Sequence, residues 1–386
     1  MNPAPASPSA SNPTAVPVAE PLPTADVTPG EGAAVTHDPA AAVEVCVVIV
    51  NYRTPGLTLD CLDSLAPEVA DRGDIRVVVV EGGSGDDSAQ ILQDGIADRG
   101  YGRWVTLDVR QENAGFAGGN NAAIVPALQQ DPPPRFVWLL NPDTVVRPGA
   151  LEQLLAFMQQ HPAAGLAGSR LEDPDTTPQA SAFRFPSLLN TFESTLRLGP
   201  VSRLLNNRLT AMPIRDEPHR ADWLAGASLL VRREVLQAVG PLDAGYFMYF
   251  EETDFCLAAR RAGFECWYVP TSRVVHLVGQ ASGVTAKHSA AQPAKRRPRY
   301  WFDSRKRYFV KNHGRLGAAL ADAAWIAGFA AWRLRVNLTG RRHDPDPPRM
   351  LADFIRHSVF VSGFGGHTFH AKDHANTLNP APGKNP

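Results

Sequence analysis

The sequence lacks the signals of several common protein classes. Its four cysteines form no CxxC pair and have no histidine at zinc-finger spacing. This spacing argues against a disulfide scaffold and against a structural zinc site. A location in the reducing cytosol fits these cysteines best. A GxxxxGK[S/T] phosphate loop, a GxGxxG fingerprint after the first strand and a GxSxG elbow are also missing. These absences count against kinases, ATPases, simple dehydrogenases and serine hydrolases.

Basic residues are missing from the first 43 residues, which contain nine prolines and no lysine or arginine. A secretory signal needs a basic start followed by an uninterrupted apolar core. We therefore expect 1–43 to be a disordered tail rather than a signal. The segment 361–386, rich in glycine and proline towards its end, predicts a second flexible tail.

Net charge is almost absent, because two oppositely charged parts cancel. The whole chain has 38 Lys and Arg against 39 Asp and Glu. Residues 1–286 hold 20 basic and 33 acidic side chains, whereas residues 287–386 hold 18 and 6. The sequence therefore predicts an acidic main part followed by a basic end.

Strands and helices alternate in the first half of the acidic part. Each of four apolar, mostly β-branched runs is followed by a helical pattern, and the helices are expected to end near residues 69, 95, 130 and 160. The four expected strands are 45–50, 76–80, 104–109 and 136–140. Strands that are apolar on both faces and joined by helices imply a mostly parallel sheet with helices on both sides.

A polar or glycine-rich segment follows each expected strand. In parallel sheets, ligands bind beyond the carboxyl ends of the strands. Glycine, Asn and Asp also form ordinary turns, so one such loop alone predicts only a turn. Four together favour a nucleotide-type site. The segments are Asn51-Tyr52-Arg53, Glu81 to Ser88, Asn113 to Asn121 and Asn141 to Thr144.

The segment Asn141-Pro142-Asp143 is a candidate metal-binding fragment. On an extended chain, residues 141 and 143 project to the same side, and a carboxylate at the mouth of a sheet can hold a hard divalent cation between two phosphates. The same fragment is equally a good turn. His276 ends a short apolar run, and it becomes a metal ligand if the fold places it beside Asp143.

Three carboxylates form a second cluster. Glu251, Glu252 and Asp254 follow an aromatic run at 246–250 and begin a helical pattern that reaches Gly263. Carboxylates in a first helical turn interact well with the helix dipole, so capping alone would explain them. The aromatic run instead favours a cleft wall, where one carboxylate accepts a proton from an attacking hydroxyl.

Taken together, these motifs resemble those of the family 2 glycosyltransferases, and most closely those of the bacterial rhamnosyltransferase-like branch. The resemblance covers roughly residues 44–280 in the family's order and spacing. The residues that carry it are Asn51-Tyr52, Glu81 to Ser88, Asn113-x-Gly115-Phe116-Ala117-x-Gly119-Asn120-Asn121, Leu140-Asn141-Pro142-Asp143-Thr144, Gly226-Ala227, Phe250-Glu251-Glu252-x-Asp254 and His276.

The resemblance implies a GT-A fold, which is an α/β fold with a mostly parallel central sheet and helices on both faces. We expect this catalytic domain at 44–286 and a C-terminal helical extension at 287–360. The implied reaction moves a sugar, such as rhamnose, with inversion from a nucleotide-diphosphate donor to a glycan or polyprenyl-diphosphate-linked acceptor in cell-envelope or exopolysaccharide synthesis. The implied cofactor is Mg²⁺ or Mn²⁺.

The resemblance also assigns residue roles. Glu252 takes the place of the catalytic base, Glu251 and Asp254 shape the acceptor side, and Asp143 and His276 bind the metal. The implied nucleotide-sugar site consists of Asn51, Tyr52, Arg53, Glu81, Asn113, Gly115, Phe116, Gly119, Asn120, Asn141, Asp143 and Gly226.

Two positions depart from the family pattern. Glu81-Gly82-Gly83-Ser84 replaces the usual Asp-Asn-x-Ser, and Asn141 replaces the first Asp of the DxD-like motif. These changes leave the nucleotide open. The altered Glu81-Gly82-Gly83 loop also motivates an alternative, a catalytically inactive GT-A domain that binds a nucleotide sugar or serves as a scaffold.

The basic end begins with a segment, 287–315, that holds ten Lys and Arg, one Asp and five aromatic residues. It suits an anionic membrane surface contacted through 287–342, and it equally suits packing on the acidic domain of the same chain; nucleic acid is a weaker alternative. The apolar stretch 316–332 is too short to span a bilayer and contains Asp322. We expect a cytoplasmic protein, peripheral at the inner face of the membrane.

Overall fold

The computed structural model describes residues 43–204, 208–277, 295–340 and 346–365. Most of the two predicted tails, 1–43 and 361–386, and the predicted domain boundary between 286 and 287 lie outside these residues.

The described residues form eleven strands, eleven α-helices and one 3₁₀ helix. The strands are β1 Val45–Asn51, β2 Ile75–Glu81, β3 Val105–Val109, β4 Phe136–Leu140, β5 Thr144–Val146, β6 Ala164–Glu172, β7 Ala182–Phe183, β8 His219–Ala221, β9 Trp223–Leu224, β10 Ser228–Arg232 and β11 Glu265–His276. The helices are α1 Pro55–Val69, α2 Ser88–Asp98, η1 Tyr101–Arg103, α3 Gly115–Leu128, α4 Ala150–Gln160, α5 Leu188–Leu196, α6 Gly199–Leu204, α7 Arg233–Val239, α8 Glu251–Arg261, α9 Arg299–Thr339, α10 Met350–His357 and α11 Val359–Ser362.

A nine-stranded sheet is the centre of the fold, with eight strands in the order β3-β2-β1-β4-β10-β6-β11-β5 and β8 paired with β11. Neighbouring strands from β3 to β4 are parallel, as the sequence predicts. The other half is mixed, because β10 runs antiparallel to both β4 and β6. A separate pair, β7 and β9, forms a small second sheet.

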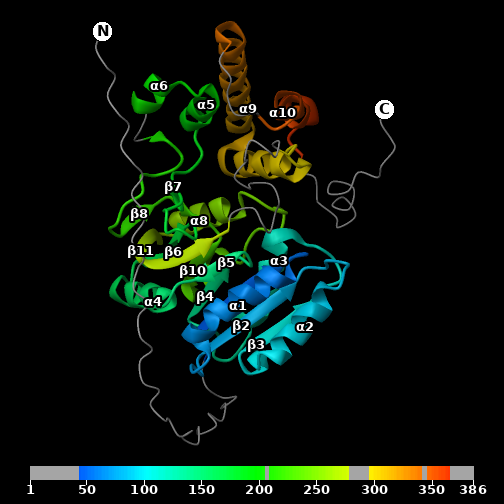
Figure 1. Ribbon diagram of the computed structural model, residues 1–386. Helices are drawn as coiled ribbons and strands as arrows, with labels where there is room; N and C mark the ends of the chain where they lie inside the picture. Colours follow the sequence, from blue (N-terminus) through cyan, green and yellow to red (C-terminus); the bar gives the residue numbers. More distant parts are fainter. Residues whose placement is uncertain (1–42, 205–207, 278–294, 341–345, 366–386) are drawn as a thin grey trace, which may run out of the picture. The chain divides into compact units, whose positions relative to one another are not determined.

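Helices cover both faces of the sheet (Figure 1). Side chains alternate between the two faces of a strand, so Val45 and Val47 of β1 join a core with α1, α2 and α4, whereas Cys46 and Val48 join a core with α3, α7 and α8. The prediction of a mostly parallel sheet between two helical layers is confirmed.

Strand pairing brings the predicted motifs to one edge of the sheet. β1 and β2 end together, with Asn51 aligned to Glu81, and β4 ends beside them at Leu140. The chain then returns along β10, whose approach is fixed by a hydrogen bond from the Asn141 backbone N–H to the Ala227 carbonyl at 3.0 Å. Segments distant in the sequence therefore meet at the carboxyl ends of the parallel strands.

Helix α9 contains the apolar stretch 316–332, and it is interrupted at Gly314, whose φ of 70° is not helical. The N-terminal arm carries cations that pair with the acidic main part of the chain. Arg307 and Lys311 approach Asp243 at 2.8 and 2.7 Å. These pairs support packing on the acidic part of the same chain for this arm.

Asp322 lies inside the C-terminal arm of α9, where it is buried and pairs with the buried guanidinium of Arg305. Its other carboxylate oxygen accepts a hydrogen bond from the Val359 backbone N–H at 2.8 Å, which ties α11 to α9. The one acidic residue of 316–332 therefore faces protein. Among the residues that the structure describes, no helix combines the length and the apolar character needed to cross a membrane.

Replacing Asp322 by Ala would leave the Arg305 charge buried without its partner. We expect Asp322→Ala to lower the free energy of unfolding by about 3–5 kcal/mol, measured by urea titration. The matched control is Asp216→Ala, because Asp216 is 91% exposed in its ion pair with Arg170; its loss should cost less than about 1 kcal/mol. Equal, small effects of the two substitutions would contradict a structural role for the buried pair.

Candidate active site

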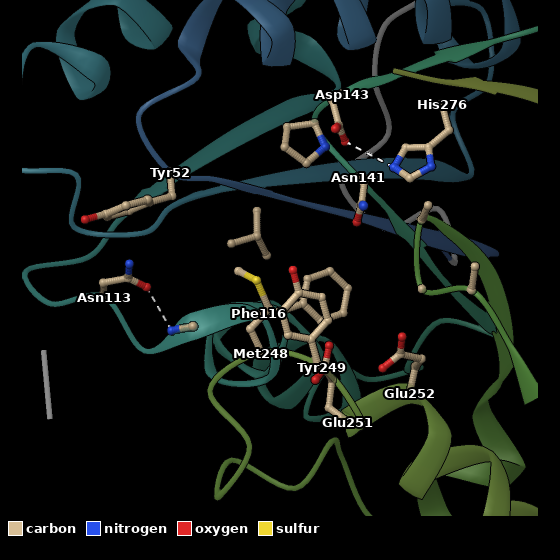
Figure 2. Close-up of a pocket in the computed structure, with 16 residues that line it drawn as sticks. Tyr52, Asn113, Phe116, Asn141, Asp143, Met248, Tyr249, Glu251, Glu252 and His276 are labelled. Atoms are coloured by element: carbon tan, nitrogen blue, oxygen red, sulfur yellow. Dashed lines mark hydrogen bonds and ion pairs between the residues drawn. The ribbon is translucent and has the colours of Figure 1, made fainter. Parts of the chain in front are cut away.

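A cavity of about 260 Å³ lies at the carboxyl edge of the parallel strands (Figure 2). Ten of the site residues predicted from the sequence line it: Tyr52, Asn113, Gly115, Phe116, Asn141, Asp143, Gly226, Glu251, Glu252 and His276. The structure adds lining residues that the sequence did not single out as site residues, namely Val50, Pro142, Ala225, Ala227, Met248 and Tyr249. Of these, Met248 and Tyr249 belong to the aromatic run before Glu251, which was the available signal.

One side of the cavity carries the candidate metal ligands. β5 pairs antiparallel with the end of β11, so that His276 lies opposite Thr144 and next to Asp143. The His276 Nε2 atom is 3.6 Å from Asp143 Oδ1, and the Leu277 backbone N–H donates to the Asp143 carbonyl at 2.9 Å. Asp143 is only 2% exposed.

Asn141 contributes a third polar group to this side. Its Oδ1 atom is buried, and the described residues offer it no hydrogen-bond partner. Figure 2 shows Asn141, Asp143 and His276 together, with Glu251 and Glu252 across the cavity from them.

This donor set fits Mg²⁺ or Mn²⁺, because a carboxylate, an amide oxygen and an imidazole suit hard and borderline divalent ions. Within the described part of the chain, no three His, Cys, Asp or Glu residues gather as a complete metal site. A cation held by Asp143 and His276 would therefore need further ligands from a diphosphate or water, as a cofactor ion that bridges a substrate does.

The opposite side carries the two glutamates at the start of α8. Tyr249 and Phe250, which precede them, both have positive φ values, 71° and 68°. Side chains other than glycine seldom adopt this conformation, and the strain it stores is typical of functional sites. The left-handed step turns the chain so that Glu251 and Glu252 enter the first turn of α8 beside the cavity.

The environment of the glutamates favours their protonated forms. Burial raises the pKa of Glu252 to about 7. Burial and the neighbouring Glu252 charge raise the pKa of Glu251 well above its usual range. A Glu252 carboxylate whose pKa lies near 7 can take up a proton near neutral pH.

Gly115 allows the loop before α3 to touch Phe247, two residues before the strained segment. Its φ is +70°, and a Cβ atom there would lie 2.0 Å from the Phe247 carbonyl oxygen. The Phe116 backbone N–H donates to that same oxygen at 2.7 Å. A Cβ on Gly226 would lie 3.2 Å from the Phe116 ring. Gly115 thus lets the loop before α3 pack on Phe247, and Gly226 lets the chain before β10 approach Phe116.

Six predicted site residues do not line this cavity: Asn51, Arg53, Glu81, Gly119, Asn120 and Asp254. Asn51 is fully buried and accepts hydrogen bonds from Thr54 and Thr58 at the start of α1. Asn120 donates to the Phe116 carbonyl within α3. Their roles in nucleotide binding stay predictions.

Glu81 and Arg53 shape neighbouring loops through Ser84. The Glu81 carboxylate accepts hydrogen bonds from the Ser84 backbone N–H at 3.0 Å and from its hydroxyl. The Arg53 backbone N–H donates to Ser84 Oγ at 2.9 Å. The longer acid that departs from the family pattern is thus used to fold its own loop.

Asp254 is directed towards α9. Its carboxylate accepts hydrogen bonds from Lys311 Nζ and Asn312 Nδ2, each at 2.6 Å. This contact joins α8, which carries the glutamates, to the C-terminal extension. Its role on the acceptor side stays a prediction.

Comparison with known proteins identifies the family. The family model "Glycosyltransferase like family 2" matches residues 41–299. The N-acetylglucosaminyl-diphospho-decaprenol L-rhamnosyltransferase of Mycobacterium tuberculosis (strain ATCC 25618 / H37Rv) is 33% identical over 315 residues, which cover 77% of this chain and 91% of that protein. Rhamnosyltransferase WbbL of Escherichia coli (strain K12) is 28% identical over 170 residues, 42% of this chain and 60% of that protein.

The fold also matches a solved structure. The chain superposes on GalNAc-T7 with UDP, GalNAc and Mn²⁺ with a TM-score of 0.52 at 14% identity, over 84% of this chain and 56% of that one. The predicted GT-A fold is confirmed by this likeness. From the family match and the similarity to rhamnosyltransferases, the chain belongs to the glycosyltransferase-like family 2 and is a glycosyltransferase.

Proposed function

We propose that this glycosyltransferase inverts the anomeric centre of the sugar it transfers and depends on Mg²⁺ or Mn²⁺. The observation that supports this is the placement of Asp143 and His276 on one side of a single cavity and of Glu252 on the other (Figure 2). Inversion in one step requires a leaving group and a base on opposite faces of the sugar, and no enzyme nucleophile.

The proposed donor is a nucleotide diphosphate carrying L-rhamnose, and the proposed acceptor is an N-acetylglucosaminyl-diphosphate lipid. We take this donor sugar and this acceptor from the name of the relative from M. tuberculosis, an N-acetylglucosaminyl-diphospho-decaprenol L-rhamnosyltransferase. This chain matches that relative over 91% of the relative's length. Such a lipid-linked acceptor belongs to cell-envelope polysaccharide synthesis and would bring the protein to the inner face of the membrane.

Asp143 and His276, with Asn141 beside them, are the residues that would hold the cation and orient the donor diphosphate. When bound, the cation neutralises the charge that develops on the leaving diphosphate. Phe116 and Gly226 would form the wall against which the transferred sugar lies, because both line the cavity between the two polar sides.

Glu252 would accept the proton of the attacking hydroxyl. The acceptor oxygen forms a bond to the anomeric carbon while the bond from that carbon to the diphosphate oxygen breaks. The bonding pair leaves with the nucleoside diphosphate, and the hydroxyl proton moves to the Glu252 carboxylate. Glu251, buried beside Glu252 in the first turn of α8, would keep the surroundings of the base apolar enough to favour proton uptake when its own carboxyl is protonated.

Glu252→Gln keeps the size of the side chain and removes the base. We expect kcat to fall by about 10²–10⁴-fold, because that is the usual contribution of a positioned general base. Donor binding, followed by calorimetry, should stay unchanged. The control is Glu234→Gln, because Glu234 is exposed and lies outside the cavity. Full activity of Glu252→Gln would exclude Glu252 as the base.

The protonation of Glu252 also determines how kcat/KM should depend on pH. The reaction needs deprotonated Glu252, and its pKa is raised to about 7. We therefore expect log kcat/KM to rise with a slope of about one below pH 7 and to level off above it. Initial rates between about pH 5.5 and 8.5 would show this. A profile that is flat through this range would contradict the assignment.

Asp143→Asn should abolish the dependence of donor binding on the cation. In the wild type, a nucleoside diphosphate with Mn²⁺ should raise the melting temperature more than the nucleotide alone, because a ligand that binds only the folded state stabilises it. In Asp143→Asn the extra rise should disappear, while the exposed control Asp98→Asn retains it. The same Mn²⁺-dependent rise in both variants would contradict the metal site.

A further inference from the structure

A second cavity lies on the far side of Glu252. Glu252 and Tyr249 line both this cavity and the one described above. The other walls come from α5, from the N-terminal arm of α9 and from its C-terminal arm at Trp325. The carboxylate assigned as the base therefore stands at the boundary between two cavities.

Three tryptophans line the second cavity. Trp223 stacks on Phe183 with ring centroids 4.2 Å apart, whereas Trp325 is buried and stacks on both Phe354 and Phe329, at 3.7 and 4.8 Å. Trp301 is half-buried at the start of α9. Rings held in place by such stacking offer rigid apolar faces, and binding on rigid groups loses little conformational entropy.

Hydroxyl groups on α5 complete the cavity. Thr191 and Ser194 both line it, and their spacing of three residues puts them on one face of the helix. Ser194 is exposed, and although its hydroxyl donates to the Thr191 carbonyl, its oxygen still accepts hydrogen bonds. Apolar walls with a few convergent polar groups are typical of a site for a small organic ligand.

The charges of the residues that line the second cavity indicate whether its ligand is charged or neutral. Arg305 is the one cation among the described lining residues, and it is paired with the buried Asp322. A nucleoside diphosphate needs uncompensated positive charge or a metal. A neutral sugar ring needs neither, since its C–H faces lie against aromatic rings and its hydroxyls find polar partners.

We propose that the second cavity binds a neutral pyranose, the terminal sugar residue of the acceptor, and presents its hydroxyl to Glu252. This inference rests on the proposed function and adds to it a role for the C-terminal extension. The first cavity takes the donor, and α5 and α9 complete a separate acceptor site that the strands alone do not form. Trp223 and Trp301 provide the stacking surface, Trp325 closes the apolar wall, and Thr191 and Ser194 provide the polar contacts.

The test uses a substitution at an exposed residue whose new side chain fills the second cavity. Ser194→Trp places a bulky ring in the second cavity, and Leu189→Trp puts the same ring on α5 at a residue that is 44% exposed and lines neither cavity. Two readouts are compared in full-length protein. One is transfer from dTDP-rhamnose to a short-chain prenyl diphospho-N-acetylglucosamine, and the other is quenching of tryptophan fluorescence by methyl N-acetylglucosaminide.

We expect Ser194→Trp to raise the KM for the acceptor by about tenfold or more with little change in the KM for the donor, and Leu189→Trp to change neither. Saturable quenching by the methyl glycoside should occur in the wild type and in Glu252→Gln, and should be lost only in Ser194→Trp. An unchanged acceptor KM in Ser194→Trp, or quenching equal to that of Leu189→Trp, would overturn the assignment.

Failure of the proposed function gives a different result. If the wild type transfers no sugar but the methyl glycoside still quenches in a Ser194-sensitive manner, the cavity is a sugar site and the proposed acceptor or donor is wrong. If the wild type transfers sugar and neither readout responds to Ser194→Trp, the function stands and the cavity is not the acceptor site.

Discussion

Parallel pairing of β1 with both β2 and β4 is the constraint on which the site depends. It aligns three strand ends at one edge of the sheet, and each chain segment that leaves this edge carries polar or glycine-rich sequence. The antiparallel return of β10 and the pairing of β5 with β11 then bring Gly226 and His276 to the same edge. Residues more than two hundred positions apart meet there because the backbone hydrogen bonds leave no other register.

Across the cavity from this edge, the segment that carries Glu251 and Glu252 is held by packing and ion pairs rather than by strand pairing. Gly115 packs on Phe247, just before the left-handed residues Tyr249 and Phe250, and Phe250 packs against Tyr308 of α9. Lys311 reaches both Asp243 and Asp254, so the extension is fastened on either side of the strained segment. The basic charge of this arm therefore serves, at least in part, to dock the extension on the acidic domain.

The sequence predicts the first half of the fold well, because long β-branched runs and regular helix patterns leave few alternatives. The structure continues α2 through the buried Gly95 to Asp98, a small difference. The second half is harder to predict, because β7, β8 and β9 have only two or three residues each and owe their existence to distant partners. The contacts of α9 are hard to predict for the same reason, since Asp243, the partner of Arg307 and Lys311, lies far away in the sequence.

Within the site, motifs predict which residues gather but not what each one contacts. Asp143 and His276 were expected to meet, and they do. The hydrogen bonds of Glu81 to Ser84 and of Asp254 to α9 are contacts that no linear pattern encodes, and the ligand roles of both residues stay predictions. The second cavity had no sequence signal, because its tryptophans come from β9 and from both arms of α9.

The central claim is a single displacement between a metal-held leaving group and Glu252. The anomeric configuration of the product, read by NMR from the one-bond carbon–hydrogen coupling at the transferred sugar, tests it most directly. A configuration opposite to that of the nucleotide-sugar donor is the predicted result. A product that retains the configuration of the donor would contradict the claim, because it would require two displacements or attack from the leaving-group face.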